Sequence, residues 1–130
     1  MENKLKVLLF FLRMHWLGCS AIILAVITIL SLWPLKTLPP VPGGDKLHHF
    51  LAYAALAFPI ALRRPNRWLP IMALFIVYSG GIELIQPLAH RYAEWLDLAA
   101  NTAGIFCGIL LSEPVRWWER KKQEKQRLYR

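Results

Sequence analysis

Four long apolar stretches, separated by short polar or proline-rich segments, dominate the pattern of this chain. A helix that crosses a membrane needs about 20 mainly apolar residues. The apolar stretches therefore predict four transmembrane helices, over residues 16–33, 46–62, 68–88 and 95–111. We expect an all-α fold, an integral membrane bundle of these four helices that forms a single domain over residues 1–130.

The segment between the first two predicted helices is rich in proline and glycine. Pro39-Pro40, Pro42 and Gly43-Gly44 exclude a regular helix there, because proline lacks an amide donor and glycine loses too much entropy. We expect a loop over residues 34–44. Asp45 follows it directly, at the position of an N-cap for the next helix.

Gly104 and Gly108 lie four residues apart in the fourth predicted helix. Small residues at this spacing let two helix backbones approach closely inside a membrane. The pair predicts a close helix contact, either within one chain or between the copies of a homo-oligomer.

The basic residues indicate how the helices are oriented in the membrane. Thirteen of the 16 Lys and Arg residues lie in the segment before the first helix, in the connector after the second helix or in the tail over residues 116–130, and the other three are Lys36, Lys46 and Arg91. Cytoplasmic segments of membrane proteins are enriched in Lys and Arg, so both termini are predicted to be cytoplasmic. The net charge of +8 then fits contact with anionic membrane lipids, and no nucleic-acid partner is expected because no RNA-binding motif accompanies the tail.

With that orientation, polar residues lie near the outer ends of three predicted helices and in the outer connector. Within each helix they are spaced three or four positions apart and so share one face. Lipid does not solvate charge, so these faces turn toward the bundle interior or toward water. The sequence therefore predicts an outward-facing polar pocket, with the following ligand-binding residues: Asp45, Lys46, His49, Glu83, Gln86, Arg91, Asp97 and Asn101.

Several of these residues also have a purely structural interpretation. Gln86 and Asn101 are suited to hydrogen bonds between helices, which contribute only about 0.6 kcal/mol on average. Glu83 and Asp97 are harder to explain by packing, since a buried carboxylate costs several kcal/mol unless it is paired or protonated. A salt-bridged clamp with Arg91 is the alternative to a functional role for these two carboxylates.

The same residues, in this order, resemble the VanZ-like membrane protein family, which is named for an accessory protein of teicoplanin resistance. The likeness covers roughly half the chain, from Asp45-Lys46 and His49 through an ExxQ step at residues 83–86 and Arg91 to a DxxxNxxGxxxG run over residues 97–108. Glu94 departs from the small polar residue that the family often has in this connector, so an extra carboxylate is expected at the pocket. The resemblance implies a multi-pass protein of the bacterial cytoplasmic (inner) membrane that is connected with the cell envelope.

Two functions are compatible with this pattern. The first is a non-enzymatic pocket that binds a lipid head group, a lipid-linked envelope precursor or a lipophilic glycopeptide, with Arg91 and Lys46 meeting the anionic part. The second is a membrane-embedded enzyme that acts on a lipid-linked substrate, with His49, Glu83 and Asp97 as candidate catalytic acid and base groups. We favour the first, because no nucleophile elbow, P-loop or HExxH motif occurs in the sequence.

No cofactor or metal is expected. Cys19 and Cys107 lie alone in apolar stretches, without the CxxC spacing of a metal or redox site. A metal site is the less favoured alternative, formed by Asp45, His49, Glu83 and Asp97.

Overall fold

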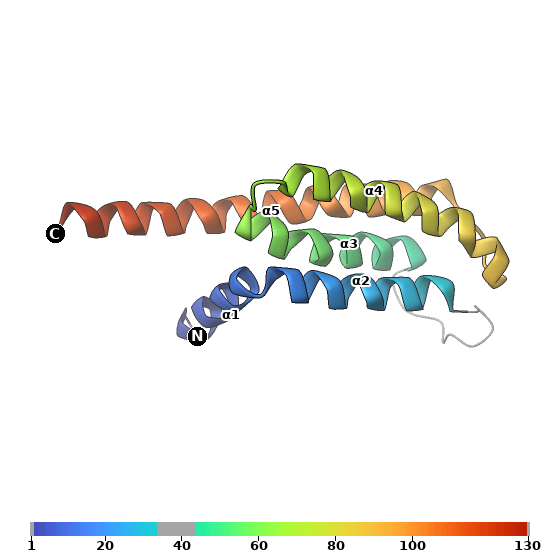
Figure 1. Ribbon diagram of the computed structural model, residues 1–130, viewed down its shortest axis with the longest axis horizontal. Helices are drawn as coiled ribbons and strands as arrows, with labels where there is room; N and C mark the ends of the chain where they lie inside the picture. Colours follow the sequence, from blue (N-terminus) through green and yellow to red (C-terminus); the bar gives the residue numbers. More distant parts are fainter. Residues whose placement is uncertain (1, 34–43, 130) are drawn as a thin grey trace.

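The computed structural model describes residues 2–33 and 44–129, and all regular structure within these ranges is helical. The helices are drawn in Figure 1 and are, in chain order, α1 (Glu2–Met14), α2 (Trp16–Leu32), α3 (Gly44–Arg63), α4 (Trp68–Ile85), the short 3₁₀ helix η2 (Gln86–Ala89) and α5 (Trp95–Leu128). The all-α prediction is confirmed for these ranges. The predicted loop over residues 34–44 lies outside the described residues except for Gly44, which begins α3 with a φ of 76°.

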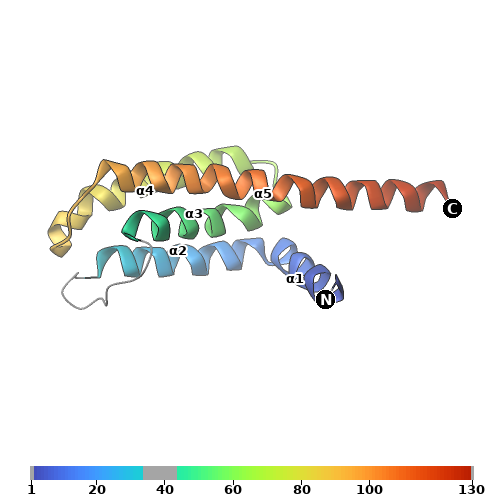
Figure 2. The same ribbon diagram turned by 180° about the vertical axis from the view of Figure 1, so that it is seen from behind.

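The four predicted helices correspond to α2, α3, α4 and α5, with two differences at the chain ends. A separate helix, α1, precedes α2 and meets it at an angle of 84°. The fourth helix does not end near residue 111, because α5 continues for 34 residues to Leu128. The reason is that the tail is rich in Glu, Lys, Arg and Gln, all strong helix formers. At 1.5 Å per residue α5 is about 51 Å long, so its basic end extends beyond the other helices (Figure 2).

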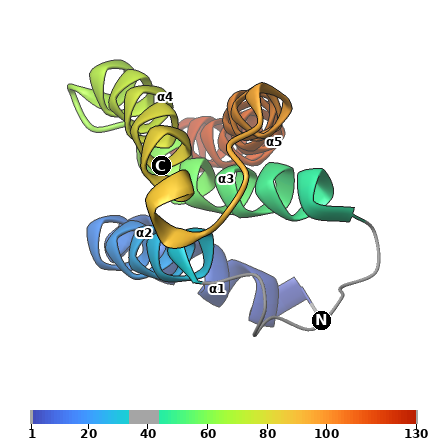
Figure 3. The same cartoon turned by 90° about the vertical axis from the view of Figure 1, so that its right-hand side faces the viewer.

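Two of the described helical segments are long and apolar enough to cross a membrane, namely α4 with η2 and α5. The bent pair of α1 and α2 is a third if it is counted as one span. Helix α3 does not meet this test, and the four-span topology with cytoplasmic termini therefore stays a prediction. Helix α3 is the central helix of the bundle. It packs against α1, α2, α4 and α5, so its surface meets other helices on several sides (Figure 3).

The core of the bundle lies along the second half of α3. Tyr53, Leu56, Ala57 and Ile60 are almost completely buried there, and Ile105 of α5 packs against this group. Small and large side chains alternate along this face, which lets neighbouring helices interdigitate. The polar first turns of α3 are thereby held at one end of a closely packed apolar core.

The closest helix contact in the bundle joins α3 to α5. A Cβ atom added at Gly104 would collide with the carbonyl oxygen of Phe50, and one added at Gly108 would collide with that of Ala54. Only glycine leaves room for these backbones to approach so closely. The close contact predicted from the glycine spacing is confirmed, and it lies within one chain.

The two chain termini lie at the same end of the bundle (Figure 1). At this end Arg13 of α1 pairs with Glu119 of α5, with Nη1 and Oε2 2.9 Å apart. Arg64, in the turn between α3 and α4, pairs with Glu113 of α5 and lies over the ring of Trp68. The predicted polar pocket therefore belongs to the opposite end, where α3 and α5 begin.

We predict that Gly104→Ala destabilises the protein by about 1–3 kcal/mol, because the new methyl group has to push α3 away from α5. Gly80→Ala is the matched control, since nothing lies within 4 Å of its added Cβ. In the control, alanine is expected to be neutral or to stabilise by up to about 1 kcal/mol. Unfolding of both variants, followed by circular dichroism in detergent, checks this, and equal stability of the two would contradict the close α3–α5 contact.

Candidate functional site

The polar side chains that the sequence singles out are concentrated at the end of the bundle away from the termini. Five of them are buried although they are charged or amide-bearing, and they come from α4, η2, the connector and α5: Glu83, Gln86, Arg91, Asp97 and Asn101. Helix α3 adds Asp45, Lys46 and His49 from its first two turns. Such burial is costly unless each group finds a partner, so the contacts of each decide what the site can do.

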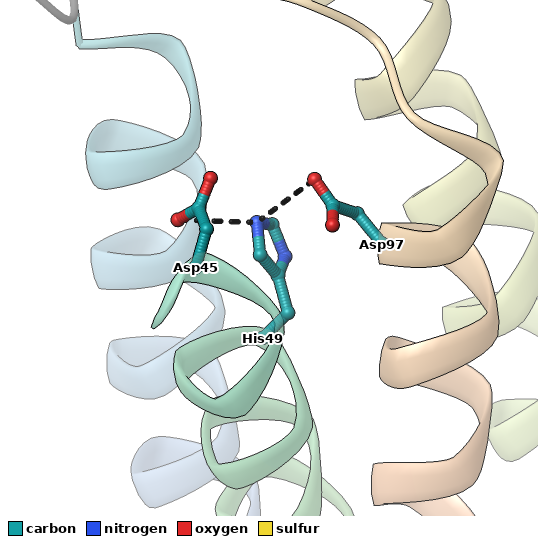
Figure 4. A group of neighbouring side chains, drawn as sticks. All are labelled: Asp45, His49 and Asp97. Carbon is teal, nitrogen blue, oxygen red and sulfur yellow. Dashed lines mark ion pairs between the residues drawn. The ribbon is translucent and has the colours of Figure 1, made fainter. Parts of the chain in front are cut away.

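His49 lies at the centre of the cluster, between two carboxylates. Its Nε2 atom is 3.9 Å from Oδ1 of Asp45, one helical turn earlier on α3, and 3.7 Å from Oδ2 of Asp97 on α5. Figure 4 shows the ring pointing into the space between the two acidic groups. Its side chain is only 10% exposed, so this contact is largely shielded from solvent.

The other ring nitrogen of His49 is held by a chain of hydrogen bonds across three helices. His49 Nδ1 lies 3.0 Å from Oδ1 of Asn101, and the Asn101 amide nitrogen donates to the hydroxyl of Ser79 at 2.7 Å. With the amide in this orientation its oxygen faces the ring, so Nδ1 is the donor. Asn101 thus fixes the plane of the imidazole and leaves Nε2 directed at the carboxylates.

Ser79 is a site residue that the sequence reasoning missed. It is completely buried on α4, one turn before Glu83 and on the same helix face. The four-residue spacing from Glu83 is the signal that would have found it. A single serine in an apolar stretch does not otherwise stand out.

The two basic residues of the site are already engaged. Arg91 donates through Nη1 to the carbonyl oxygens of Leu30 and Trp33, at 3.3 and 3.4 Å, and its Nη2 lies 3.4 Å from Asp45. These carbonyls lie at the end of α2, where helix C-termini leave backbone acceptors unsatisfied. Arg91 therefore fastens the connector after η2 to α2.

Lys46 pairs with Glu94, the residue at which this chain departs from the pattern of the VanZ-like family. Its Nζ lies 2.6 Å from Oε2 of Glu94 and 3.7 Å from Oδ1 of Asp97. The extra carboxylate thus lies at the polar cluster and pairs with the ammonium group of Lys46. Both partners in this pair are about half exposed, so the contact closes the rim of the cluster.

Asp45 does not cap α3 as predicted. Helix α3 begins at Gly44, so Asp45 lies inside its first turn. Its carboxylate is directed to Arg91 and His49, and a negative charge in the first turn is also favourable for the helix dipole.

Glu83 and Gln86, at the end of α4 and the start of η2, differ in their contacts. The Glu83 Oε2 atom accepts from the backbone amide of Glu94 at 3.3 Å, and Glu83 is within electrostatic reach of His49 and Asp97. Gln86 points the other way, because its amide nitrogen donates to the carbonyl oxygen of Ser31 at 3.3 Å. The prediction that Gln86 shares the pocket with His49 has no contact to support it among the described residues.

Three acceptor atoms of the site have no hydrogen-bond donor among the described residues. They are buried oxygens of three residues: Oε1 of Glu83, Oε1 of Gln86 and Oδ1 of Asp97. His48, by contrast, binds the carbonyl oxygen of Gly44 through Nδ1 and stays outside the cluster. The three buried oxygens can still accept a hydrogen bond from a ligand or contact a cation.

The balance of charges leads to the same conclusion. Four carboxylates meet at this end of the bundle, namely Asp45, Glu83, Glu94 and Asp97. Among the residues that the structure describes, Lys46 and Arg91 offset them, together with the imidazole of His49. The cluster therefore attracts positive charge and hydrogen-bond donors more strongly than it attracts anions.

The comparisons with known proteins agree with the sequence resemblance. No curated protein and no solved structure gives a significant match to the chain. A family model described as VanZ/LLP1 matches residues 5–116, which include every residue of the polar cluster. With helices of sufficient length and apolar character to span a bilayer, the chain is a membrane protein that belongs to the VanZ/LLP1 family.

Proposed function

We propose that this protein is an envelope protein of the bacterial cytoplasmic membrane, whose polar cluster binds the head group of a lipid, a lipid-linked envelope precursor or a lipophilic glycopeptide. The observation that carries the proposal is the pair of buried acceptors, at Glu83 and Asp97, that find no donor within residues 2–33 and 44–129. An unsatisfied buried acceptor costs about 1–3 kcal/mol. A ligand that supplies the missing donors recovers this free energy on binding.

The existing ion pairs of Lys46 and Arg91 define which part of a head group the cluster would bind. Arg91 and Lys46 already pair with Asp45 and Glu94, so a phosphate would have to displace a carboxylate from one of them. Hydroxyl and ammonium groups need no such exchange, because they donate to the free acceptors directly. The proposal is therefore that sugar hydroxyls or an amine of the head group enter the cluster.

The orientation of the chain supports access from the outer surface. The basic tail and the short α1 lie at one end of the bundle, and positive charge favours the cytoplasmic side. The cluster lies at the other end, within the first turns of α3 and α5. A head group in the outer leaflet would meet it at this depth.

A second candidate function is an enzyme that acts on a lipid-linked substrate. The arrangement that favours it is the fixed imidazole, because Asn101 orients His49 and leaves Nε2 beside Asp97. A held histidine beside a carboxylate is the pairing that general acid–base catalysis uses. Glu83 would serve as a second acidic group in this mechanism.

We predict that the wild-type protein, purified with its own membrane lipids, retains a specific ligand that Glu83→Gln and Asp97→Asn lose. Each change removes the negative charge of an acceptor that has no donor within the described structure. Native mass spectrometry of the three preparations measures the retained ligand. Glu119→Gln is the matched control, because its carboxylate pairs with Arg13 at the opposite end, and this variant should retain the ligand.

Retention of the same lipids by all of these variants, or by none, would contradict the binding proposal. Lower thermal stability without a change in ligand would then identify the carboxylates as a structural clamp. The His49→Ala variant separates the two candidate functions when conversion of the retained ligand is followed as well. A binding protein converts the ligand neither as wild type nor as His49→Ala, whereas an enzyme converts it as wild type and keeps it bound but unconverted in His49→Ala.

We also predict that Arg91→Ala destabilises the protein by about 1.5–3 kcal/mol, since it leaves carbonyl oxygens of α2 and the Asp45 carboxylate without their donor. Tyr92→Ala is the control, because its side chain is 82% exposed and its removal should cost within about 0.5 kcal/mol. Thermal unfolding in detergent compares the two. If Arg91→Ala leaves stability unchanged but abolishes ligand retention, Arg91 contacts the ligand and our structural assignment of it is wrong.

A further inference from the structure

Three side chains at the outer end of the bundle present one potential metal-ligand atom each to a common point. The atoms belong to Asp45, His49 and Asp97, and all of them lie within 4.8 Å of one another. A tetrahedral ion with bonds of about 2.0–2.2 Å spaces its ligand atoms about 3.4 Å apart. The observed separations of 3.7 and 3.9 Å from His49 Nε2 are thus close to those of a coordinated set.

Two of the three side chains are also hydrogen-bonded from behind. Asn101 accepts from Nδ1 of His49, and Arg91 donates to the second oxygen of Asp45. Metal-ligating histidines almost always donate their other N–H to such a partner, and ligating carboxylates are hydrogen-bonded in turn. Asn101 and Arg91 thus orient their ligand atoms without occupying them, whereas Lys46 lies 3.7 Å from the second oxygen of Asp97 and contributes only its charge.

Asp97 gives an independent indication that a cation belongs here. The residue is only 3% exposed, its carboxylate points at His49 in Figure 4, and its Oδ1 atom accepts no hydrogen bond within the described structure. Its nearest charged neighbours, His49 and Lys46, are both 3.7 Å away, which is too long for a hydrogen bond. A buried carboxylate in this position lacks the compensation that folded proteins normally provide.

From these observations we infer that Asp45, His49 and Asp97 bind a divalent transition-metal ion of the Zn²⁺ or Mn²⁺ type. One imidazole and two carboxylates suit these ions, and three protein ligands leave a fourth position open, as in catalytic zinc sites. The charge of the ion offsets the excess of carboxylates over Lys46 and Arg91 at the same end. The open position would accept a hydroxyl or amine of the head group.

This inference rests on the proposed function for its ligand, but metal binding is measured without any lipid. The full-length protein in detergent is stripped with EDTA and then titrated with Zn²⁺ and with Mn²⁺, by calorimetry and by elemental analysis after gel filtration. We expect one ion per chain in the wild type. His49→Gln and Asp97→Asn should weaken affinity by well over tenfold, and Asn101→Ala, which frees the imidazole, by about 10–100-fold.

His48→Gln is the matched control, because this neighbouring histidine binds Gly44 and lies outside the cluster. It should bind the ion like the wild type, and circular dichroism confirms that each variant is folded. Absence of stoichiometric binding to the wild type overturns the inference, as does equal weakening in His48→Gln and His49→Gln. Native mass spectrometry of the EDTA-treated protein keeps the two proposals separate: a lipid that stays bound without metal leaves head-group binding intact when the metal site fails.

Discussion

The close approach of α3 and α5 is the constraint on which the rest of the structure depends. It exists because Gly104 and Gly108 present bare backbone to the carbonyl oxygens of Phe50 and Ala54. Phe50 is the neighbour of His49, and Asn101 lies one turn before Gly104 on the same helix. The glycine contact therefore sets the distance over which Asn101 reaches the imidazole, and through it the geometry of the whole cluster.

The polar end of the bundle follows from this contact. Once α3 and α5 are held together, His49 and Asp97 face each other in a space that solvent barely enters. Their burial is costly, and the described groups around them offset only part of the cost. Arg91 is tied to α2, Lys46 is shared with Glu94, and buried acceptors find no donor in the described part of the chain. A structure that served packing alone would not need such a set of charges. We infer that the acceptors without a donor in the described structure are free to bind a ligand.

Much of the fold could be predicted because it depends on local pattern. Apolar stretches of sufficient length marked α2, α3, α4 and α5, and the glycine spacing marked the α3–α5 contact. The basic tail was predicted to lie outside the fourth helix, yet its helix-forming residues continue α5 to Leu128. Helix α1 was not separated from α2, because the bend at His15 carries no proline and the nearest glycine, Gly18, already lies in the first turn of α2.

The site could be predicted less completely, because side-chain partners depend on tertiary structure. Spacing along α3 predicted that Asp45 and His49 share one face, and the structure has Asp97 of α5 beside them. It did not reveal that Arg91 turns to the carbonyl oxygens of α2, or that Gln86 donates to Ser31. Both contacts depend on where α2 ends relative to the connector after η2. A local sequence pattern does not predict that position.

The geometry of the cluster depends on Asn101, which holds the His49 imidazole with Nε2 directed at the carboxylates. Nitrogen-15 NMR of histidine-labelled protein in nanodiscs tests this contact directly, with His49 assigned from a His49→Gln sample. We expect a proton on Nδ1 of His49, and a change of the His49 signals alone among the four histidines in Asn101→Ala. An unprotonated Nδ1, or His49 signals that do not respond to Asn101→Ala, would show that Asn101 does not hold the imidazole.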